Sequence, residues 1–421
     1  MKKLVIKGGK KLSGIVSVNG SKNATLPIMA ASILTDSPST INNIPMVRDI
    51  KTMAELFRIL GAKVFLESNT MHIQPDTINN FKAPYELVKT MRASIYVLGP
   101  LLAKYGKAQV SMPGGCAIGL RPIDLHLKGM QKLGAKIEIK HGYVKATAKK
   151  LKGAKIVFDK VSLGATVNVM LAAVLAQGVT VIENASKEPE IADTANFLIK
   201  MGADIKGAGT GTITIKGRKK LSGVMDYSVI PDRIEAATLA CAALITKGNV
   251  TVRGFDPKQL DLFFEKLKEA GASFVLTGDG VKIKAHKGSL KGTDIITEPY
   301  PGFPTDIQAQ WMALMSTASG RSVIKEKIWE NRFMHALELS RMGADIKLDG
   351  NTAVVAGVKK LSSADVMASD LRASAALILA ALAAEGTTEI RRVYHLDRGY
   401  EKLDEKLRSL GANVRAEDEG M

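Results

Sequence analysis

The chain has 421 residues, of which 46% are hydrophobic, and this length exceeds what a single core usually holds. Its 59 Lys and Arg outnumber 41 Asp and Glu, and the formal charge of +18 favours anionic ligands. The longest apolar stretches, such as 373–384, fall well short of the roughly 20 residues that span a bilayer, so no membrane span is expected.

The N-terminal residues lack the apolar core of a secretory signal, which predicts a cytoplasmic protein. Two cysteines, Cys116 and Cys241, are too few for a disulfide framework. The six histidines form no metal-type cluster with them. We therefore expect neither disulfides nor a metal site.

A helix ending of the form Gly-Ala, any residue, apolar residue recurs six times. Successive glycines are 68 to 73 residues apart, which is typical of a repeat architecture. Each glycine is expected to adopt the left-handed conformation that ends a helix. The six endings occupy 60–64, 133–137, 201–205, 270–274, 342–346 and 410–414.

In chain order, each repeat is expected to form a strand, a helix, a strand, a second helix and a pair of strands. The second helices, such as 50–60 and 261–270, are amphipathic. The first helices are rich in Ala and apolar all round, which indicates burial. This pattern predicts an α/β fold with an inside-out arrangement, in which the first helices are central and the sheets and second helices surround them. The first helices start after Asn23, Arg92, Ala165, Arg233, Asp306 and Arg372.

The two ends of the chain are predicted to form one repeat together. Only seven residues follow Val414, so the last repeat lacks the alternating strand and basic turn of the others, whereas residues 1–14 carry that segment without a preceding helix. This predicts a discontinuous domain, 1–21 and 230–421, and an inserted domain, 22–229, with three repeats in each. The active site is expected in the cleft between them.

Three cations stand where the first helices begin, namely Lys22, Arg92 and Arg372. A cation there opposes the helix dipole, so it indicates an anion that both can bind. Polar residues at equivalent positions, Ser162, Thr305 and Asp370, are equally well explained as helix caps.

One loop before a second helix is extended. It contains three glycines, Cys116 and Arg121 within 113–122, and we interpret it as a mobile lid. The basic surroundings favour a reactive Cys116 thiolate, whereas Cys241 lies in an apolar helix and is expected to be an inert core residue.

Several charged residues at these loops suggest chemistry on an anionic substrate. Arg121, Arg398, Lys22 and Arg372 could together hold a phosphate and a carboxylate, because a guanidinium pairs with either group. Asp306 is a candidate general base. The sequence has no Gly-rich strand-to-helix fingerprint for nucleotides.

These residues resemble those of the UDP-N-acetylglucosamine enolpyruvyl transferase family, the UDP-N-acetylglucosamine 1-carboxyvinyltransferases, over essentially the whole chain. The resemblance implies a pair of inside-out α/β barrel domains, each with threefold internal symmetry, that close on the substrate like a hinge. It departs from the usual pattern only slightly, at Ser21 and Leu163. The matching segments are 20–23, 89–94, 116–126, 304–306, 330–335, 370–374 and 397–400.

The family's activity is the transfer of the enolpyruvyl group of phosphoenolpyruvate to the 3-hydroxyl of UDP-N-acetylglucosamine, with release of phosphate and without a cofactor. This is the first committed step of peptidoglycan synthesis. The resemblance implies that Cys116 is the proton donor, that Asp306 takes the hydroxyl proton, and that Lys22 and Arg398 also act in catalysis. The implied phosphoenolpyruvate ligands are Lys22, Asn23, Arg121, Arg332, Arg372 and Arg398. The implied UDP-sugar ligands are Asn23, Arg92, Arg121, Pro122, Ile123, Asp124, Leu125, Lys160, Val161, Ser162, Leu163, Asp306 and Ile328.

Two alternatives stay open at this point. The shikimate-pathway enolpyruvyl transferase shares the architecture and also uses phosphoenolpyruvate, although it lacks the loop with the cysteine. A repeat scaffold that binds nucleic acid through its charge is disfavoured by the low aromatic content of 5% and by the absence of long basic runs. We expect small-molecule substrates and no nucleic acid, membrane or obligate protein partner.

Overall fold

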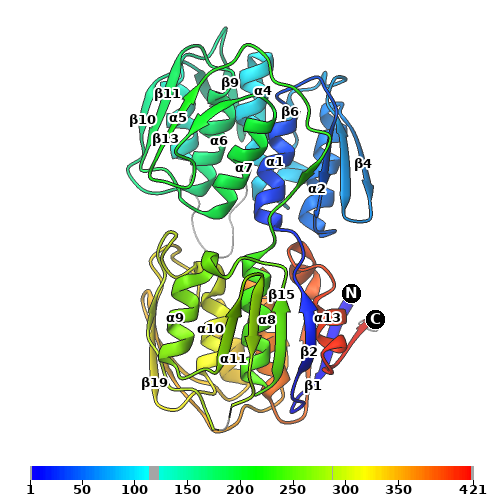
Figure 1. Cartoon of the computed structure of the whole chain (residues 1–421), viewed down its shortest axis with the longest axis vertical. Helices are drawn as coiled ribbons and strands as arrows, with labels where there is room; N and C mark the ends of the chain where they lie inside the picture. The colour runs from blue at the N-terminus through cyan, green and yellow to red at the C-terminus, as the bar shows by residue number, and fades with distance from the viewer. Residues whose placement is uncertain (1, 113–122, 287, 419–421) are drawn as a thin grey trace. The chain divides into compact units, whose positions relative to one another are not determined.

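The computed structural model describes residues 2–112, 123–286 and 288–418. The described chain forms two compact units, one of residues 2–19 and 231–418 and the other of residues 20–112 and 123–230 (Figure 1). Each unit has its own hydrophobic core. Among the described residues, no helix is both long and apolar enough to cross a membrane.

Each unit contains three four-stranded sheets of the same design. The first two strands of a sheet are parallel and the other two join antiparallel, as in β10, β11, β13 and β12. In the unit of residues 20–230 the sheets are β14 (Tyr227–Ser228), β3 (Ser39–Asn42), β5 (Thr70–Gln74) and β4 (Lys63–Glu67); β6 (Lys82–Ala83), β7 (Lys107–Ser111), β9 (Tyr143–Thr147) and β8 (Lys136–Lys140); and β10 (Lys155–Val157), β11 (Val179–Glu183), β13 (Thr212–Lys216) and β12 (Asp204–Lys206).

The sheets of the other unit follow the same order. They are β2 (Ser13–Ser17), β15 (Asn249–Arg253), β17 (Gly280–Ile283) and β16 (Phe274–Thr277); β18 (Ile295–Ile296), β19 (Arg321–Lys325), β21 (Thr352–Ala356) and β20 (Asp345–Asp349); and β22 (Asp365–Met367), β23 (Thr387–Arg391), β1 (Lys2–Lys7) and β24 (Asn413–Asp418).

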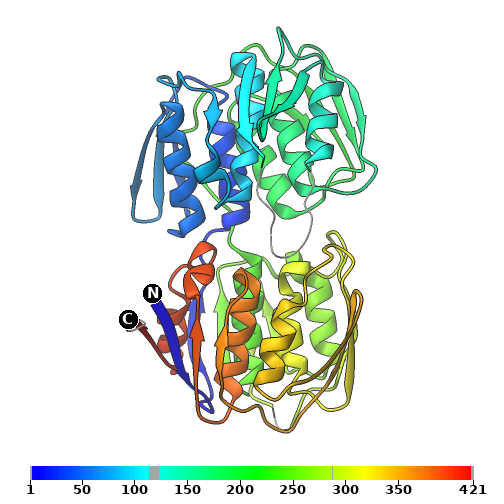
Figure 2. The same ribbon diagram turned by 180° about the vertical axis from the view of Figure 1, so that it is seen from behind.

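The first helices of the repeats form the centre of each unit, as the sequence predicts, and the sheets surround them (Figures 1 and 2). Their residues are almost all buried, because these helices have no polar face to turn to water. The central helices are α1 (Lys22–Ser32), α4 (Leu98–Tyr105) and α6 (Leu163–Ala173) in one unit, and α8 (Arg233–Ile245), α10 (Gln308–Met315) and α12 (Leu371–Ala383) in the other.

The second helices are amphipathic and bury one face. They are α2 (Arg48–Leu60), α5 (Asp124–Lys132), α7 (Pro189–Lys200), α9 (Asp261–Glu269), α11 (Met334–Arg341) and α13 (Leu403–Ser409). The described chain also contains short helical turns, namely α3 (Tyr85–Val88), η1 (Arg92–Val97), η2 (Pro257–Leu260), η3 (Thr305–Ile307) and η4 (Val393–Arg398).

The predicted helix starts at Arg92 and Asp306 need correction. Both segments begin as 3₁₀ turns, η1 and η3, and the α-helices start only at Leu98 and Gln308. In η3 the Ile307 amide donates to the Pro304 carbonyl, the i to i+3 bond of a tighter turn. The Asp306 side chain therefore lies in this turn.

The six Gly-Ala endings behave as predicted. Every glycine of this set has a positive φ, between 80° and 104°, so each one occupies the left-handed region that glycine tolerates best. They are Gly61, Gly134, Gly202, Gly271, Gly343 and Gly411.

The N-terminal strand completes the last repeat, which confirms the closure inferred from the sequence. Strand β1 pairs antiparallel with both β23 and β24, with Leu4 opposite Ile390 and Ala416. The next strand, β2, pairs parallel with β15, and β14 pairs parallel with β3. A strand distant in sequence thus closes the ring of sheets in each unit.

A buried ionic network holds the chain where it leaves β2. The Lys406 ammonium lies 2.6 Å from the Glu235 carboxylate and donates to the Asn19 side chain at 2.9 Å. The backbone amide of Asn19 donates to the other Glu235 oxygen at 2.7 Å. Burial raises the pKa of Glu235, although the neighbouring Lys406 opposes that shift. This network anchors residue 19, where the described chain passes from one unit to the other.

Candidate active site

Lys22 and Asp49 form an ion pair at the starts of α1 and α2. Their charged atoms are 3.1 Å apart, and their side chains are only 12% and 4% exposed. Ser21 caps α1 by accepting from the Ala24 amide. The anion that the sequence predicts beside the Lys22 cation is, in this structure, a protein carboxylate. The neighbouring Asn23 is half-buried on the first turn of the same helix.

Arg92 lies at the start of η1 and is half-buried. Burial, and secondarily the charge of Arg92, lowers the pKa of His126 to about 3, so this imidazole is neutral at pH 7. The buried Asn168 amide lies 3.1 Å from His126 Nδ1 and also bonds the Ile95 carbonyl and the Gly99 amide. This hub ties the Arg92 turn to the first turn of α5.

The remaining predicted sugar ligands of this unit surround the starts of α5 and α6. Ser162 is the N-cap of α6 and accepts from the Ala165 amide at 3.2 Å, so its cap role is established. The others are Ile123 and Leu125, which are buried; Asp124 and Lys160, which are exposed; and Val161 and Leu163, which are half-buried.

In the other unit, two arginines grip the carboxylate of Asp306. Arg332 Nη2 lies 2.8 Å from one oxygen of Asp306, and Arg372 Nη2 lies 2.8 Å from the other. The arginine side chains are 4% and 5% exposed, whereas Asp306 is 29% exposed. Burial lowers the pKa of Arg372, but Asp306, Tyr400 and Asp232 together outweigh it and the pKa is raised. The site thus holds two permanent positive charges around a carboxylate that solvent still reaches.

The buried carboxylate of Glu326 organises the loop that carries Asp306. It accepts from the hydroxyl of Thr305 at 2.9 Å and of Thr297 at 2.6 Å. It also accepts from the backbone amides of Ile328 and Trp329 at 2.8 and 3.2 Å. Thr305 is therefore not a helix cap, and Glu326 fixes the Asp306 turn and the half-buried Ile328 to one another.

Arg398 is half-buried at the end of η4, and Asp370 caps α12 by accepting from two backbone amides. Cys241 is completely buried in α8, and burial raises the pKa of its thiol, which confirms it as an inert core residue. Cys116, Arg121 and Pro122 lie outside the described residues, as does the extended loop interpreted as a lid. Within the described ranges no group of three His, Cys, Asp or Glu side chains could hold a metal ion.

Known proteins resemble this chain along its whole length. A family model described as EPSP synthase (3-phosphoshikimate 1-carboxyvinyltransferase) matches residues 6–407. The UDP-N-acetylglucosamine 1-carboxyvinyltransferase of Geotalea uraniireducens is 57% identical over 414 residues, which cover 98% of this chain and 99% of that protein. The protein of the same name from Nitratidesulfovibrio vulgaris is 53% identical over 419 residues, with both chains covered completely.

The chain belongs to the UDP-N-acetylglucosamine 1-carboxyvinyltransferase family. Solved structures agree with this assignment. The enolpyruvyl transferase NikO from Streptomyces tendae superimposes with a TM-score of 0.90 at 29% identity, covering 99% of this chain and 98% of that one. EPSP synthase from Acinetobacter baumannii, with a TM-score of 0.76 and 19% identity over 99% of this chain and 100% of that one, shares the fold.

Sequence reasoning missed several buried polar residues that support the candidate site. Glu326, Asn168, Gln310 and Thr238 were not singled out, although all four are buried and hydrogen-bonded. A signal existed for three of them, because Asn168, Thr238 and Gln310 are polar residues within the largely apolar helices α6, α8 and α10. A polar residue in such a helix must find a partner inside the protein.

Proposed function

We propose that this protein transfers the enolpyruvyl group of phosphoenolpyruvate to the 3-hydroxyl of UDP-N-acetylglucosamine and releases phosphate. The observation that carries the proposal in the structure is the paired grip of Arg332 and Arg372 on one carboxylate. Two buried guanidinium groups beside the carboxylate assigned as the base supply positive charge where an anionic substrate would react. The 53–57% identity to proteins named for this activity supports the same substrates.

The chemistry is an addition followed by an elimination. The hydroxyl oxygen of the sugar bonds to the central carbon of phosphoenolpyruvate while the methylene carbon takes up a proton, giving a tetrahedral ketal. Loss of phosphate and of one proton from the new methyl group then restores the double bond. The addition needs an acid and a base. We assign these roles to Cys116 and Asp306, and the surrounding cations offset the negative charge of the substrate and intermediate.

The proposal assigns ligands to both units. In the unit of residues 20–230 it uses Lys22 and Asn23 for phosphoenolpyruvate, and Asn23, Arg92, Ile123, Asp124, Leu125, Lys160, Val161, Ser162 and Leu163 for the UDP-sugar. In the other unit it uses Arg332, Arg372 and Arg398 for phosphoenolpyruvate and Asp306 and Ile328 for the sugar. Arg121 would serve both substrates and Pro122 the sugar. The proposal includes a cytoplasmic location and no obligate protein partner.

A phosphate-release assay tests the proposal. The purified enzyme is given phosphoenolpyruvate with either UDP-N-acetylglucosamine or shikimate 3-phosphate. We expect turnover only with the UDP-sugar, because the relatives of that name match the chain so closely. Turnover with shikimate 3-phosphate instead would favour the alternative named by the family model.

The acid role of Cys116 has its own test. An epoxide that mimics phosphoenolpyruvate, such as fosfomycin, should alkylate Cys116 and inactivate the enzyme, while the buried Cys241 stays unmodified. Cys116→Asp should retain an acid, keep turnover and resist the epoxide. A mass increase on Cys241, or complete loss of turnover in Cys116→Asp, would contradict the assignment.

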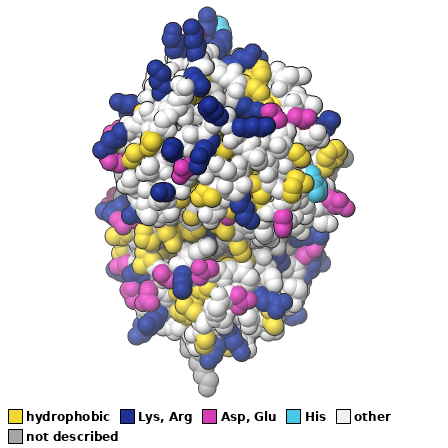
Figure 3. Space-filling view, turned by 45° about the horizontal axis from the view of Figure 1, so that its top comes forward, with side chains coloured by type: hydrophobic (Ala, Val, Ile, Leu, Met, Phe, Trp, Pro, Cys, Tyr) yellow, Lys and Arg dark blue, Asp and Glu magenta, His cyan; other side chains and the backbone are white. Residues whose placement is uncertain are grey.

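The nucleic-acid alternative gains no support. On the face shown in Figure 3, Lys and Arg side chains are dispersed among other residues and do not form a continuous stripe. A duplex needs cations aligned along its phosphates. DNA binding that persists at moderate salt would revive this alternative.

A further inference from the structure

Tyr400 joins the three central helices of its unit through a single buried hydroxyl. Its Oη lies 2.8 Å from Thr238 Oγ1 in α8, 3.2 Å from Gln310 Nε2 in α10 and 3.2 Å from Arg372 Nη1 in α12. The residue is 3% exposed, and the arginine guanidinium also lies over its ring at 5.5 Å. The hydroxyl therefore has three protein partners, each on a different helix.

The direction of these hydrogen bonds follows from the chemistry of the groups. Arg372 Nη1 can only donate, so it donates to the Tyr400 oxygen. Gln310 Nε2 is also a donor, and it shares its two hydrogens among Tyr400, the Asp306 carbonyl and Thr238 Oγ1, which lies 3.0 Å away. The Tyr400 hydrogen must then go to Thr238, whose own hydroxyl donates to the Ile234 carbonyl at 2.8 Å. Burial raises the pKa of Tyr400, which keeps this hydrogen in place. The phenol thus accepts from Arg372 and donates to Thr238.

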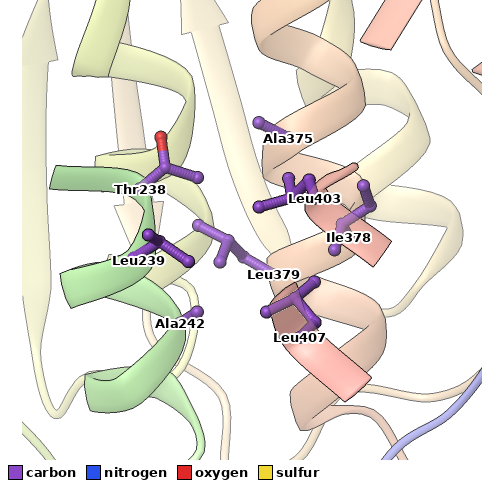
Figure 4. A pocket seen from close by; sticks show the side chains of 8 residues that line it. All are labelled: Thr238, Leu239, Ala242, Ala375, Ile378, Leu379, Leu403 and Leu407. Carbon is purple, nitrogen blue, oxygen red and sulfur yellow. The ribbon is translucent and has the colours of Figure 1, made fainter. Parts of the chain in front are cut away.

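The surroundings make this arrangement strong. Figure 4 shows Thr238 beside an apolar contact between α8, α12 and α13. The polar partners of its hydroxyl are Tyr400, the Ile234 carbonyl and the Gln310 amide nitrogen, which lies 3.0 Å away. In such a medium a hydrogen bond is stronger than in water, and an unsatisfied donor is costly. The other residues of this contact are Leu239, Ala242, Ala375, Ile378, Leu379, Leu403 and Leu407.

Two routes lead from the phenol to Asp306. Arg372 bonds Tyr400 through Nη1 and the Asp306 carboxylate through Nη2, so its guanidinium plane is fixed at both ends. Gln310 bonds Tyr400 and the Asp306 backbone carbonyl with the same amide nitrogen, at 3.2 and 3.0 Å. The Tyr400 oxygen is thus linked to the side chain of Asp306 through Arg372 and to its backbone through Gln310.

We propose that Tyr400 is a positioning residue for the transfer reaction, which orients Arg372 and Gln310 so that the Asp306 carboxylate is held where it receives the hydroxyl proton. This inference rests on the proposed function of Asp306. Tyr400 does not contact the substrate in this scheme. Its removal acts on the chemical step through the two residues that it holds.

The test is Tyr400→Phe, which keeps the ring and removes only the hydroxyl. We expect kcat to fall roughly 10- to 100-fold, since one or two hydrogen bonds that fix the base are lost and each tenfold corresponds to about 1.4 kcal/mol. The KM for the UDP-sugar should change much less than kcat, because Asp306 is one of many ligands assigned to the sugar and the others do not depend on Tyr400. The kcat–pH profile should also change, because the pairing of Arg372 with the Asp306 carboxylate is loosened.

Tyr227→Phe is the matched control. Tyr227 is also buried, at 5% exposure, and its hydroxyl donates to a carboxylate, that of Asp193, at 2.6 Å in the other unit. This variant should lose a comparable amount of thermal stability and keep the wild-type kcat and pH profile. Thr238→Val, which removes the acceptor of the phenol, should reproduce part of the Tyr400→Phe effect and serves if that variant does not fold.

The outcomes separate this inference from the proposed function. A wild-type enzyme that turns over UDP-N-acetylglucosamine, with Tyr400→Phe and Thr238→Val unchanged in kcat and pH profile, would overturn the positioning role alone. Equal kinetic losses in Tyr400→Phe and Tyr227→Phe would also overturn it, since they would report stability. A wild-type enzyme without turnover would overturn the proposed function and this role with it.

Discussion

The ammonium group of Lys22 lies 3.1 Å from the carboxylate of Asp49, and solvent barely reaches either side chain. Asp49→Asn would leave the lysine as a poorly solvated, uncompensated cation, so we expect the variant to lose about 3 kcal/mol of stability. Phosphate should restore part of that loss, because an anion that binds the folded protein at Lys22 replaces the carboxylate and stabilises by mass action. Thermal unfolding with and without added phosphate measures both effects.

Asp159→Asn provides the control for Asp49→Asn, because Asp159 pairs with Lys128 at a similar distance of 3.3 Å but is 78% exposed. That variant should unfold at nearly the wild-type temperature, and added phosphate should stabilise it no more than it stabilises the wild type. If Asp49→Asn responded to phosphate no more than the wild type, Lys22 would not be an anion site.

Glu326→Gln should raise the KM for the UDP-sugar about 5- to 10-fold. The glutamine keeps the shape of the side chain, but its amide nitrogen cannot accept, so at least one of the four donors that Glu326 satisfies is left without its acceptor. The turns of Asp306 and Ile328 then lose their common support. Steady-state kinetics with each substrate varied in turn measures the effect.

Glu298→Gln is the matched variant for that experiment. Glu298 belongs to the same region and pairs with Lys327 at 2.8 Å, but it is 51% exposed and supports neither turn. Its kinetics should stay at wild-type values. A rise in KM in both variants would point to a general effect of charge.

Stability should depend on pH through Asp193. Burial raises the pKa of Asp193 to about 6, although hydrogen bonds from Tyr227 and Ile230 oppose this shift. An acid with a higher pKa in the folded state binds its proton more tightly there than in the unfolded state. Its contribution to the free energy of unfolding is therefore fully present below about pH 4, the pKa of the unfolded chain, and is lost as the pH rises through about 6. Asp193→Asn should therefore gain on the order of 3 kcal/mol relative to wild type between pH 4 and pH 7. Chemical denaturation at several pH values tests this, and a difference that stays constant with pH would refute it.

Lys406→Met should destabilise its unit by about 3–5 kcal/mol at pH 8, since it leaves the buried Glu235 carboxylate without its cation. At pH 5 the loss should be smaller, because the unpaired carboxyl group can take up a proton. Lys402→Met, at a side chain that is 66% exposed, should change little. Equal losses of stability in the two variants would show that the pairing of Lys406 with Glu235 does not stabilise the fold.

The repeat architecture could be predicted because it is written in local signals. Glycine at a left-handed helix end is a requirement of the backbone, and all six predicted positions, from Gly61 to Gly411, have positive φ. The pairing of β1 with β24 followed from counting which repeat lacked a strand. Apolar helices such as α8 were expected to be buried because they have no polar face.

The arrangement of the site could be predicted only in part. Lys22, Asp306, Arg332 and Arg372 were selected from the sequence. Their ion pairs depend on contacts between segments far apart in the chain, 27 residues for Lys22 and Asp49 and 66 for Arg372 and Asp306. The role of Glu326 was invisible for the same reason, since a single glutamate directly after the last strand residue, Lys325, carries no local signal. The 3₁₀ turn at Asp306 was not predicted either, because it depends on the contacts that Thr305 and Asp306 make with Glu326 and Arg332.

The pairing of β1 with β24 places Lys2 opposite Asp418, so the first and last strands of the chain are neighbours in one sheet. A flexible peptide of a few residues would therefore join them, and new termini could be opened at the exposed turn between β4 and β5, near Ser68. Such a circular permutant should fold with its sheets intact, since no ladder is interrupted. The chain would then pass through the six repeats from a different starting point. A wild-type circular dichroism spectrum and wild-type turnover of the permutant would show that the position of the chain ends does not specify the fold.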